Sequence, residues 1–116
     1  AQTCVNRIRI KHIDPLSNQR QQDFIVWIEA CAPSPYQLDR PLQPQALAGD
    51  AGFRRYYRLP GQRSLIAVDS PPEKENNPAY IAVALCLQRH GITTPKILAV
   101  DFARGFMLLE DFGHQL

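Results

Sequence analysis

The sequence predicts an α+β domain, because strand-like runs and helical patterns follow one another in a consistent order along its 116 residues. Five runs have the length and patterning of strands, at residues 45–48, 53–59, 64–69, 95–102 and 106–110. One helical pattern precedes these runs, and a second lies between the third and the fourth. A turn with two glycines separates the first two runs. The predicted order is therefore helix, strand, glycine turn, strand, strand, helix, strand, strand.

Size and composition limit the chain to one modest domain. With 45% hydrophobic and 21% charged residues, it can form a single core but is too short for two. The net charge of +2 is far below the clustered positive charge of a dedicated nucleic-acid binder. No apolar run has the length of a signal peptide or a membrane span, and Cys4, Cys31 and Cys86 are spaced like core thiols. We therefore expect a soluble, cytoplasmic protein.

The chain begins with residues 1–16, whose loose alternation fits either an edge strand or a poorly ordered extension. A helix is then predicted over about residues 18–31, with Ser17 or Asn18 as its cap and Gln21 reaching back. Its apolar residues recur at helical spacing, at Phe24, Trp27, Ile28 and Cys31. We expect this face to lie on the sheet. The four prolines of residues 32–44 predict an extended connector.

The glycine turn is the feature with the clearest chemical meaning, and it consists of Gly49, Asp50, Ala51 and Gly52. Glycines allow a close backbone approach and unusual dihedral angles, so the turn can direct N–H groups at an anion such as phosphate. Considered alone, the two glycines are better explained by an ordinary hairpin loop. Their place between two strands, with a helix and a hinge-like segment following, favours a cover over phosphate instead.

The second strand alternates between two faces. One face carries Phe53, Arg55, Tyr57 and Leu59. The other carries Arg54, Tyr56 and Arg58. The first face is the more apolar, so we expect it to meet the core.

The second helix is marked by Asn77 as cap, Pro78 in the first turn and Gly91 as the stop. Its apolar residues between 81 and 87 lie all around the helix, which predicts cover on more than one side. The short turn 103–105 joins the last two strands as a hairpin.

Four stretches carry a resemblance to a known family: LAGDAGFRRYYRL, SLIAVDSPPEKE, HGITTPKILAVD and GFMLLEDFG. Together they cover residues 47–113. In this order they resemble the aminoglycoside phosphotransferase and choline-kinase-like family, and in particular its bacterial amino-sugar kinases of cell-wall recycling. Those enzymes phosphorylate N-acetylmuramate and N-acetylglucosamine at the anomeric hydroxyl. The resemblance implies that the chain takes part in a sugar kinase that transfers the γ-phosphate of ATP to a sugar hydroxyl.

The resemblance also implies a fold. Residues 17–116 would form the kinase-like N-terminal lobe, a twisted antiparallel sheet of about five strands with one packed helix above ATP. The family's HGD loop, its downstream Asn and its metal-binding Asp have no counterpart in this sequence. We therefore expect the Mg²⁺ ligands to lie in an absent C-terminal lobe and the 116-residue chain to be inactive alone.

By the same resemblance, the glycine turn and Phe53 cover the nucleotide phosphates, with Asp50 shaping the turn. The Glu110 carbonyl would accept a hydrogen bond from the adenine amino group, and the Phe112 N–H would donate to the ring. Ile66, Ala67 and Leu109 would supply apolar walls for the base.

Strand three lacks the lysine that related kinases use to hold phosphates, since it reads Ala67, Val68, Asp69. An acid near polyphosphate repels it unless a cation intervenes. We expect Arg54 or Arg58 to supply the positive charge, although both fit equally well on a solvated strand face. Glu75 fits either the positive end of the second helix or a role as partner of that cation.

Several other residues have simpler interpretations. The triplet 111–113 spells DFG, but no HRD loop precedes it, so we do not expect a metal ligand there. The three histidines lack neighbouring ligands, and Trp27 and Met107 are expected in the core. Leu65, Val83, Leu87 and Leu108 are expected to expose apolar area on the lower surface of the lobe.

Two alternatives from other classes remain open. RRYYR at residues 54–58 also fits a basic aromatic strand that stacks single-stranded nucleic acid, with affinity that falls steeply with salt. The scattered positions of the other basic residues weigh against this alternative. A scaffold that only docks a partner would share the fold and bind no nucleotide.

Overall fold

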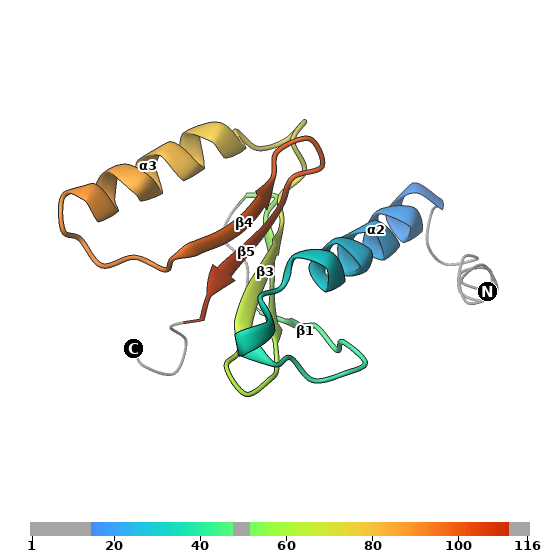
Figure 1. The fold of residues 1–116 in the computed structure, drawn as a ribbon. Helices are drawn as coiled ribbons and strands as arrows, with labels where there is room; N and C mark the ends of the chain where they lie inside the picture. The colour runs from blue at the N-terminus through green and yellow to red at the C-terminus, as the bar shows by residue number, and fades with distance from the viewer. Residues whose placement is uncertain (1–14, 48–51, 112–116) are drawn as a thin grey trace. The chain divides into compact units, whose positions relative to one another are not determined.

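A computed structural model describes residues 15–47 and 52–111 of the chain. The chain forms two compact units, residues 1–31 and residues 32–116 (Figure 1).

The first unit contains helix α2, Pro15–Cys31. The helix begins at Pro15 rather than near Asn18, in agreement with the preference of proline for a first turn. Ser17 and Asn18 therefore lie inside the helix and not at its cap. Three residues of the predicted apolar face are buried, Phe24, Trp27 and Ile28. That this face lies on the sheet stays a prediction.

The second unit contains one antiparallel sheet in the order β1-β2-β3-β5-β4. Its strands are β1 (Gln45–Ala46), β2 (Arg55–Leu59), β3 (Leu65–Asp69), β4 (Ile97–Asp101) and β5 (Phe106–Glu110). All five predicted strands are present, each within its predicted range. The α+β fold is confirmed and is consistent with a kinase-like N-terminal lobe.

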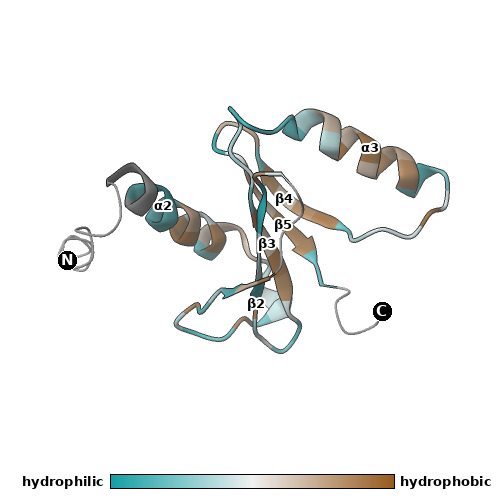
Figure 2. Cartoon of the chain, turned by 180° about the vertical axis from the view of Figure 1, so that it is seen from behind, coloured by the Kyte–Doolittle hydropathy of each residue, from teal (hydrophilic) through white to brown (hydrophobic). Residues whose placement is uncertain are grey.

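One face of the sheet, which we call the α3 face, packs against helix α3, Asn77–Arg89. The core cluster on this face consists of Val68, Met107 and Leu109, with Tyr80 and Ile81 of α3 packed against it. Figure 2 shows the hydrophobic residues along β3, β4 and β5 that form this layer.

Strand β2 turns the face opposite to the predicted one toward this cluster. Tyr56 pairs with Val68 and packs on the core, while Phe53 is 57% exposed and Arg55 is exposed. The predicted assignment was wrong for Phe53 and Arg55. An aromatic or aliphatic residue stands on both faces of β2, so alternation alone could not tell the two sides apart.

On the other face of the sheet five residues are fully buried, Leu59, Leu65, Ala67, Phe106 and Leu108, whereas Arg55 on the same face is exposed. The predicted exposure of Leu65 and Leu108 was therefore wrong. Successive residues of a strand point to opposite faces of the sheet, and both leucines point to the face opposite α3. They therefore do not lie on the surface on which Val83 is exposed.

Helix α3 is capped by Asn76 and not by Asn77. The Asn76 side chain accepts a hydrogen bond from the Ala79 N–H at 3.1 Å. Beyond the helix, Gly91 adopts a φ of 81°, as its predicted role as the stop requires.

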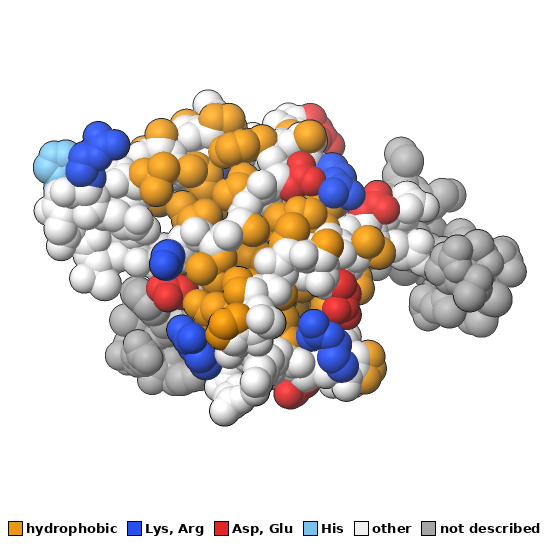
Figure 3. Space-filling model, viewed as in Figure 1, with side chains coloured by type: hydrophobic (Ala, Val, Ile, Leu, Met, Phe, Trp, Pro, Cys, Tyr) orange, Lys and Arg blue, Asp and Glu red, His pale blue; other side chains and the backbone are white. Residues whose placement is uncertain are grey.

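Cover on more than one side of α3 is not seen among the described residues. Val83 and Leu85 are 59% and 49% exposed. Figure 3 shows hydrophobic side chains gathered over this helix. The described sheet occupies one side of α3 only, which leaves these residues in contact with solvent.

Asn77 instead forms a buried, hydrogen-bonded pair with Ser70, which we call the buried lock. Its side-chain oxygen accepts from the Ser70 hydroxyl at 2.6 Å, and its amide group donates to the Ser70 carbonyl at 2.8 Å. The Ser70 N–H in turn donates to the Gly105 carbonyl at 2.7 Å. The lock therefore joins the end of β3, the start of α3 and the β4–β5 turn.

The proline-rich segment at the start of the second unit, residues 32–44, is more ordered than a plain extended segment. It contains a short 3-10 helix, η2 (Ser34–Tyr36), and Leu38 forms an isolated bridge with Gly61. Tyr36 and Leu38 are buried, although the sequence pattern did not mark them as core. The proline-rich segment is thus anchored to the β2–β3 turn.

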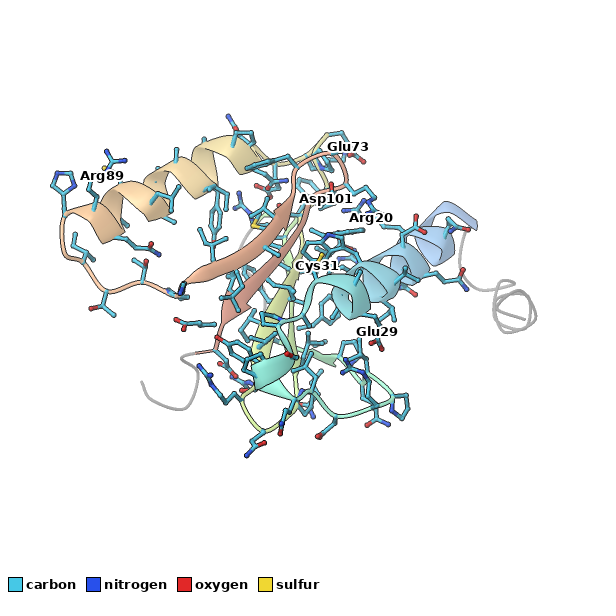
Figure 4. The ribbon with its side chains drawn as sticks, in the orientation of Figure 1. Arg20, Glu29, Cys31, Glu73, Arg89 and Asp101 are labelled. Atoms are coloured by element: carbon cyan, nitrogen blue, oxygen red, sulfur yellow. The ribbon has the colours of Figure 1, made fainter. Side chains whose placement is uncertain are left out.

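The β4–β5 turn is held by Asp101, which is labelled in Figure 4 at the end of β4. Its carboxylate accepts from the Arg104 N–H at 3.0 Å and from Arg104 Nε at 2.8 Å. The backbone bond from Arg104 is the largest cause that lowers the pKa of Asp101, while desolvation partly opposes it.

This lowered pKa predicts an acid-dependent loss of stability. The unfolded chain binds the Asp101 proton at the ordinary value of about 3.9. The contribution of Asp101 is therefore full above about pH 4 and is lost as the pH falls through its lower folded pKa. Urea unfolding between pH 6 and pH 2 should show this loss in the wild type and a smaller one in Asp101→Asn. Equal pH profiles would contradict the assignment.

Candidate functional site

The exit of the glycine turn is tied to the segment that leads into α3. Gly49, Asp50 and Ala51 lie outside the described residues, whereas Gly52 and Phe53 are described and exposed. The Phe53 N–H donates to Glu75 Oε2 at 2.7 Å. Lys74 Nζ lies 5.1 Å from the centre of the Phe53 ring, within cation–π range. The turn's exit is thus fixed by residues from another part of the chain.

Arg54 is a nearly buried cation next to this exit. Its Nη1 lies 3.4 Å from Glu75 Oε1, and the two side chains are 13% and 15% exposed. Its guanidinium carbon lies 4.3 Å above the Tyr80 ring. Its Nε is buried and has no hydrogen-bond partner among the described residues. An orphaned buried donor of this kind is costly, and the described residues supply no acceptor for it.

A cavity of about 510 Å³ opens beside Arg54. It lies on the α3 side of the sheet, and its walls include Arg54, Glu75, Tyr80, Thr94, Ile97 and Leu109. One end carries the charged pair, and the remainder is mainly apolar. A molecule with a polar part and an apolar part matches this distribution.

Arg58, the other predicted cation, has a different partner at the other end of β2. Its Nε lies 2.7 Å from Asp111 Oδ2, and the Asp111 side chain is 1% exposed. The Asp111 hydrogen bond, followed by its charge, raises the pKa of Arg58. Arg54 and Arg58 are four positions apart along an extended segment, which corresponds to roughly 13 Å. The structure therefore does not bring the two arginines together.

The predicted apolar walls divide between the two faces of the sheet. Ile66 and Leu109 lie on the α3 face, where Ile66 packs against the core cluster. Ala67 is fully buried on the opposite face, so it does not line the same space as its two neighbours. Ala67, Val68 and Asp69 form the stretch of β3 that lacks the lysine of related kinases. Of these three residues, only Val68 lies on the α3 face, which is also the face of Arg54.

Glu110 ends β5 and is described, whereas Phe112 lies outside the described residues. The Glu110 N–H donates to the Lys96 carbonyl at 3.0 Å. The Lys96 N–H donates to the carboxylate Glu110 Oε1 at 3.2 Å. The backbone carbonyl and the backbone N–H of Lys96 are thus both hydrogen-bonded to Glu110 at the end of the sheet.

The sequence interpretation missed two residues of the site. Tyr80 stacks on Arg54, although nothing in the sequence pattern marked it as a partner of an arginine. Asp111 was considered only as part of a DFG triplet, yet its carboxylate is paired with Arg58. The spacing of two residues between Leu109 and Asp111, on one face of β5, was the available signal.

Two of the three arginines of RRYYR, Arg54 and Arg58, give no support to a nucleic-acid interface, whereas Arg55 is exposed. Arg54 and Arg58 are both ion-paired with acids of the same chain, and Arg54 is nearly buried. In the described ranges, no three metal-ligating side chains come together, and no helix is long and apolar enough to cross a membrane.

Comparison with known proteins identifies relatives of one kind. The chain is 36% identical over 102 residues to the N-acetylmuramate/N-acetylglucosamine kinase of Pseudomonas aeruginosa. The aligned stretch covers 83% of this chain and 30% of that protein. The protein of the same name from Pseudomonas putida is 41% identical over 71 residues, or 60% of this chain and 21% of its own length. The Caulobacter vibrioides protein is 33% identical over 100 residues, 62% of this chain and 28% of its own length.

No protein-family model matches the chain, and no solved structure does. The resemblance predicted from the four motif stretches is confirmed by these relatives. The chain is a homologue of bacterial N-acetylmuramate/N-acetylglucosamine kinases and spans 21–30% of the length of the curated relatives that it matches.

Proposed function

We propose that the chain contributes the nucleotide-binding lobe of a kinase that transfers the γ-phosphate of ATP to a hydroxyl of an amino sugar. The observation that carries the proposal is the Arg54–Glu75 pair, which lies at the exit of the glycine turn and beside a cavity with apolar walls. The kinase names of the relatives support the reaction class and the acceptor.

Phosphoryl transfer needs the protein mainly to position the phosphates and to neutralise their charge. Arg54 would provide the cation that strand β3 lacks, because its Nε is an unused donor next to the turn. Backbone N–H groups of residues 49–52 would bind phosphate oxygens. ATP, with Mg²⁺ held by ligands outside the described residues, would supply the group to be transferred.

Glu75 and Tyr80 would hold Arg54 in place. A guanidinium that stacks on a ring and pairs with a carboxylate loses fewer conformations when it binds an anion. The Phe53 N–H binds the same carboxylate, so the turn and the cation are positioned together. The base would lie toward Ile66 and Leu109 and contact the backbone of Glu110 and Phe112.

Arg54→Ala in the full-length protein should raise KM for ATP roughly 10- to 100-fold, the value of one lost charged hydrogen bond. KM for the sugar should stay unchanged, because the cation contacts only the nucleotide. Arg54→Lys should restore part of the affinity, since it keeps the charge but not the stacked, forked geometry. Steady-state kinetics with each substrate varied in turn gives these values.

Arg55→Ala is the matched control, since Arg55 is the next residue of β2 and lies exposed on the other face. It should leave both KM values unchanged. An unchanged KM for ATP in Arg54→Ala would remove Arg54 from the site and take the main support from the proposal.

The remaining parts of the proposal concern the whole protein. The relatives are more than three times as long as the matched stretch, and their remaining length would supply the general base, the metal ligands and the sugar pocket. It would also cover the exposed Val83 side of α3. We place the enzyme in the cytoplasm and in cell-wall recycling, and we expect the 116-residue chain to be inactive alone.

A further inference from the structure

Lys74 is a charged residue at the exit of the glycine turn that the proposed function does not use. Its Nζ lies 5.1 Å from the centre of the Phe53 ring, and Phe53 is 57% exposed. Within residues 15–47 and 52–111, the Lys74 ammonium forms no ion pair, although a glutamate flanks it on each side in the sequence. The exit of the turn therefore carries a positive charge that no described acid pairs with.

The two flanking glutamates have other surroundings. Glu75 uses one carboxylate oxygen for the Phe53 N–H, at 2.7 Å, and the other for Arg54 Nη1, at 3.4 Å. Glu73 is exposed, so water and salt screen its charge. Neither carboxylate holds the Lys74 ammonium, which leaves its donors available to a ligand.

The backbone that carries Lys74 is fixed at several points. The buried lock closes the two ends of the segment 71–76. Inside this segment, the N–H groups of Lys74 and Glu75 both donate to the Pro71 carbonyl at 3.0 Å. The Glu75 carboxylate ties the segment to the Phe53 N–H. The base of the lysine side chain is thus held beside the exit of the turn, while its exposed stem keeps its rotatable bonds.

The contact with the Phe53 ring is weak enough to be exchanged for a phosphate. A cation over an exposed aromatic ring is attracted only weakly, because water screens it. A hydrogen bond from an ammonium to a phosphate oxygen is stronger, because both groups are ionised. A lysine also has a flexible stem that can turn its donors toward a new partner. The ring contact is therefore a resting position from which the ammonium can reach a bound anion.

We propose that Lys74 is a second phosphate-binding cation, which leaves the Phe53 ring to contact the phosphates of ATP and shares with Arg54 the role of the lysine that β3 lacks. This inference rests on the proposed function. Phe53 and Arg54 are consecutive, so the ammonium over the ring and the guanidinium lie at neighbouring positions of one segment. A triphosphate carries several negative charges, which two cations neutralise better than one.

The test compares the binding of ATP and of adenosine to the full-length protein by calorimetry. Lys74→Ala should weaken ATP binding about tenfold, the value of one charged hydrogen bond. Adenosine binding should stay unchanged, because adenosine has no phosphate. Lys74→Arg should retain most of the ATP affinity, since it keeps the charge.

Arg89→Ala is the matched control, because it removes an exposed positive charge at the other end of α3 (Figure 4). It should bind both ligands as the wild type does. A melting temperature for each variant shows whether the exposed side chain of Lys74 also contributes to stability.

Unchanged ATP binding in Lys74→Ala, or equal losses for ATP and adenosine, would overturn the inference. If Arg54→Ala weakens ATP binding and Lys74→Ala does not, the inference is wrong and the proposed function stands. A wild-type protein that binds no ATP would overturn both, which is an outcome distinct from the other two.

Discussion

Gly105→Ala is expected to lower the free energy of unfolding by roughly 2–5 kcal/mol. This loss is the sum of two penalties, one for a left-handed backbone conformation and one for a steric overlap. Gly105 has a φ of 79°, and a Cβ there would lie 2.0 Å from the Ser70 carbonyl oxygen. The backbone must shift to relieve this overlap. Such a shift breaks the Ser70 N–H bond to the Gly105 carbonyl, which links β3 to the β4–β5 turn.

Gly91→Ala isolates the dihedral part of this effect. Gly91 has nearly the same φ, 81°, but a Cβ there meets nothing within 4 Å. We expect a loss of about 1–2 kcal/mol from the left-handed conformation alone. Urea unfolding followed by circular dichroism compares the two variants. Equal losses would show that the contact with Ser70 adds no cost.

Asn77→Ala is expected to cost roughly 2–4 kcal/mol, because it leaves buried polar groups of Ser70 without partners. Asn77 is 2% exposed and Ser70 is fully buried. Their two hydrogen bonds, at 2.6 and 2.8 Å, lie where water cannot replace the lost amide. The loss should appear as a lower urea midpoint with an unchanged slope.

Asn76→Ala is the control for this experiment. It removes an exposed helix cap one residue earlier and should cost about 1 kcal/mol. The Ser70→Ala/Asn77→Ala double variant should lose less than the sum of the single variants, since both remove the bond between the Ser70 hydroxyl and the Asn77 side-chain oxygen. A larger loss in Asn76→Ala than in Asn77→Ala would contradict the assignment of Asn77 to the buried lock and of Asn76 to the cap.

The strands and helices followed from periodicity, and the errors arose where periodicity carries no information. Two asparagines in succession offer two possible caps, and only the fold shows that Asn77 turns inward to Ser70. Strand β2 has aromatic and basic residues on both faces. Its inward face is decided by the partner strand, which places Val68 opposite Tyr56.

The candidate site shows the same limit. Arg54 and Arg58 share a face and a charge, so both fit equally well as phosphate ligands when only the sequence is considered. Their partners, Glu75 and Asp111, lie 21 and 53 residues further along the chain, and only tertiary structure assigns them. The residues 49–51 and Phe112 lie outside the described part of the chain, so their assignment to the nucleotide stays a prediction.

The position of Glu75 has a mechanical consequence. One carboxylate holds both the Phe53 N–H and the Arg54 guanidinium, and α3 begins two residues after it. A displacement at the start of α3 must therefore pull on the strand that leaves the glycine turn, and a pull on that strand must reach the helix. We therefore expect a spectroscopic reporter on α3 to register a change of conformation at Phe53 and Arg54, the residues that leave the turn.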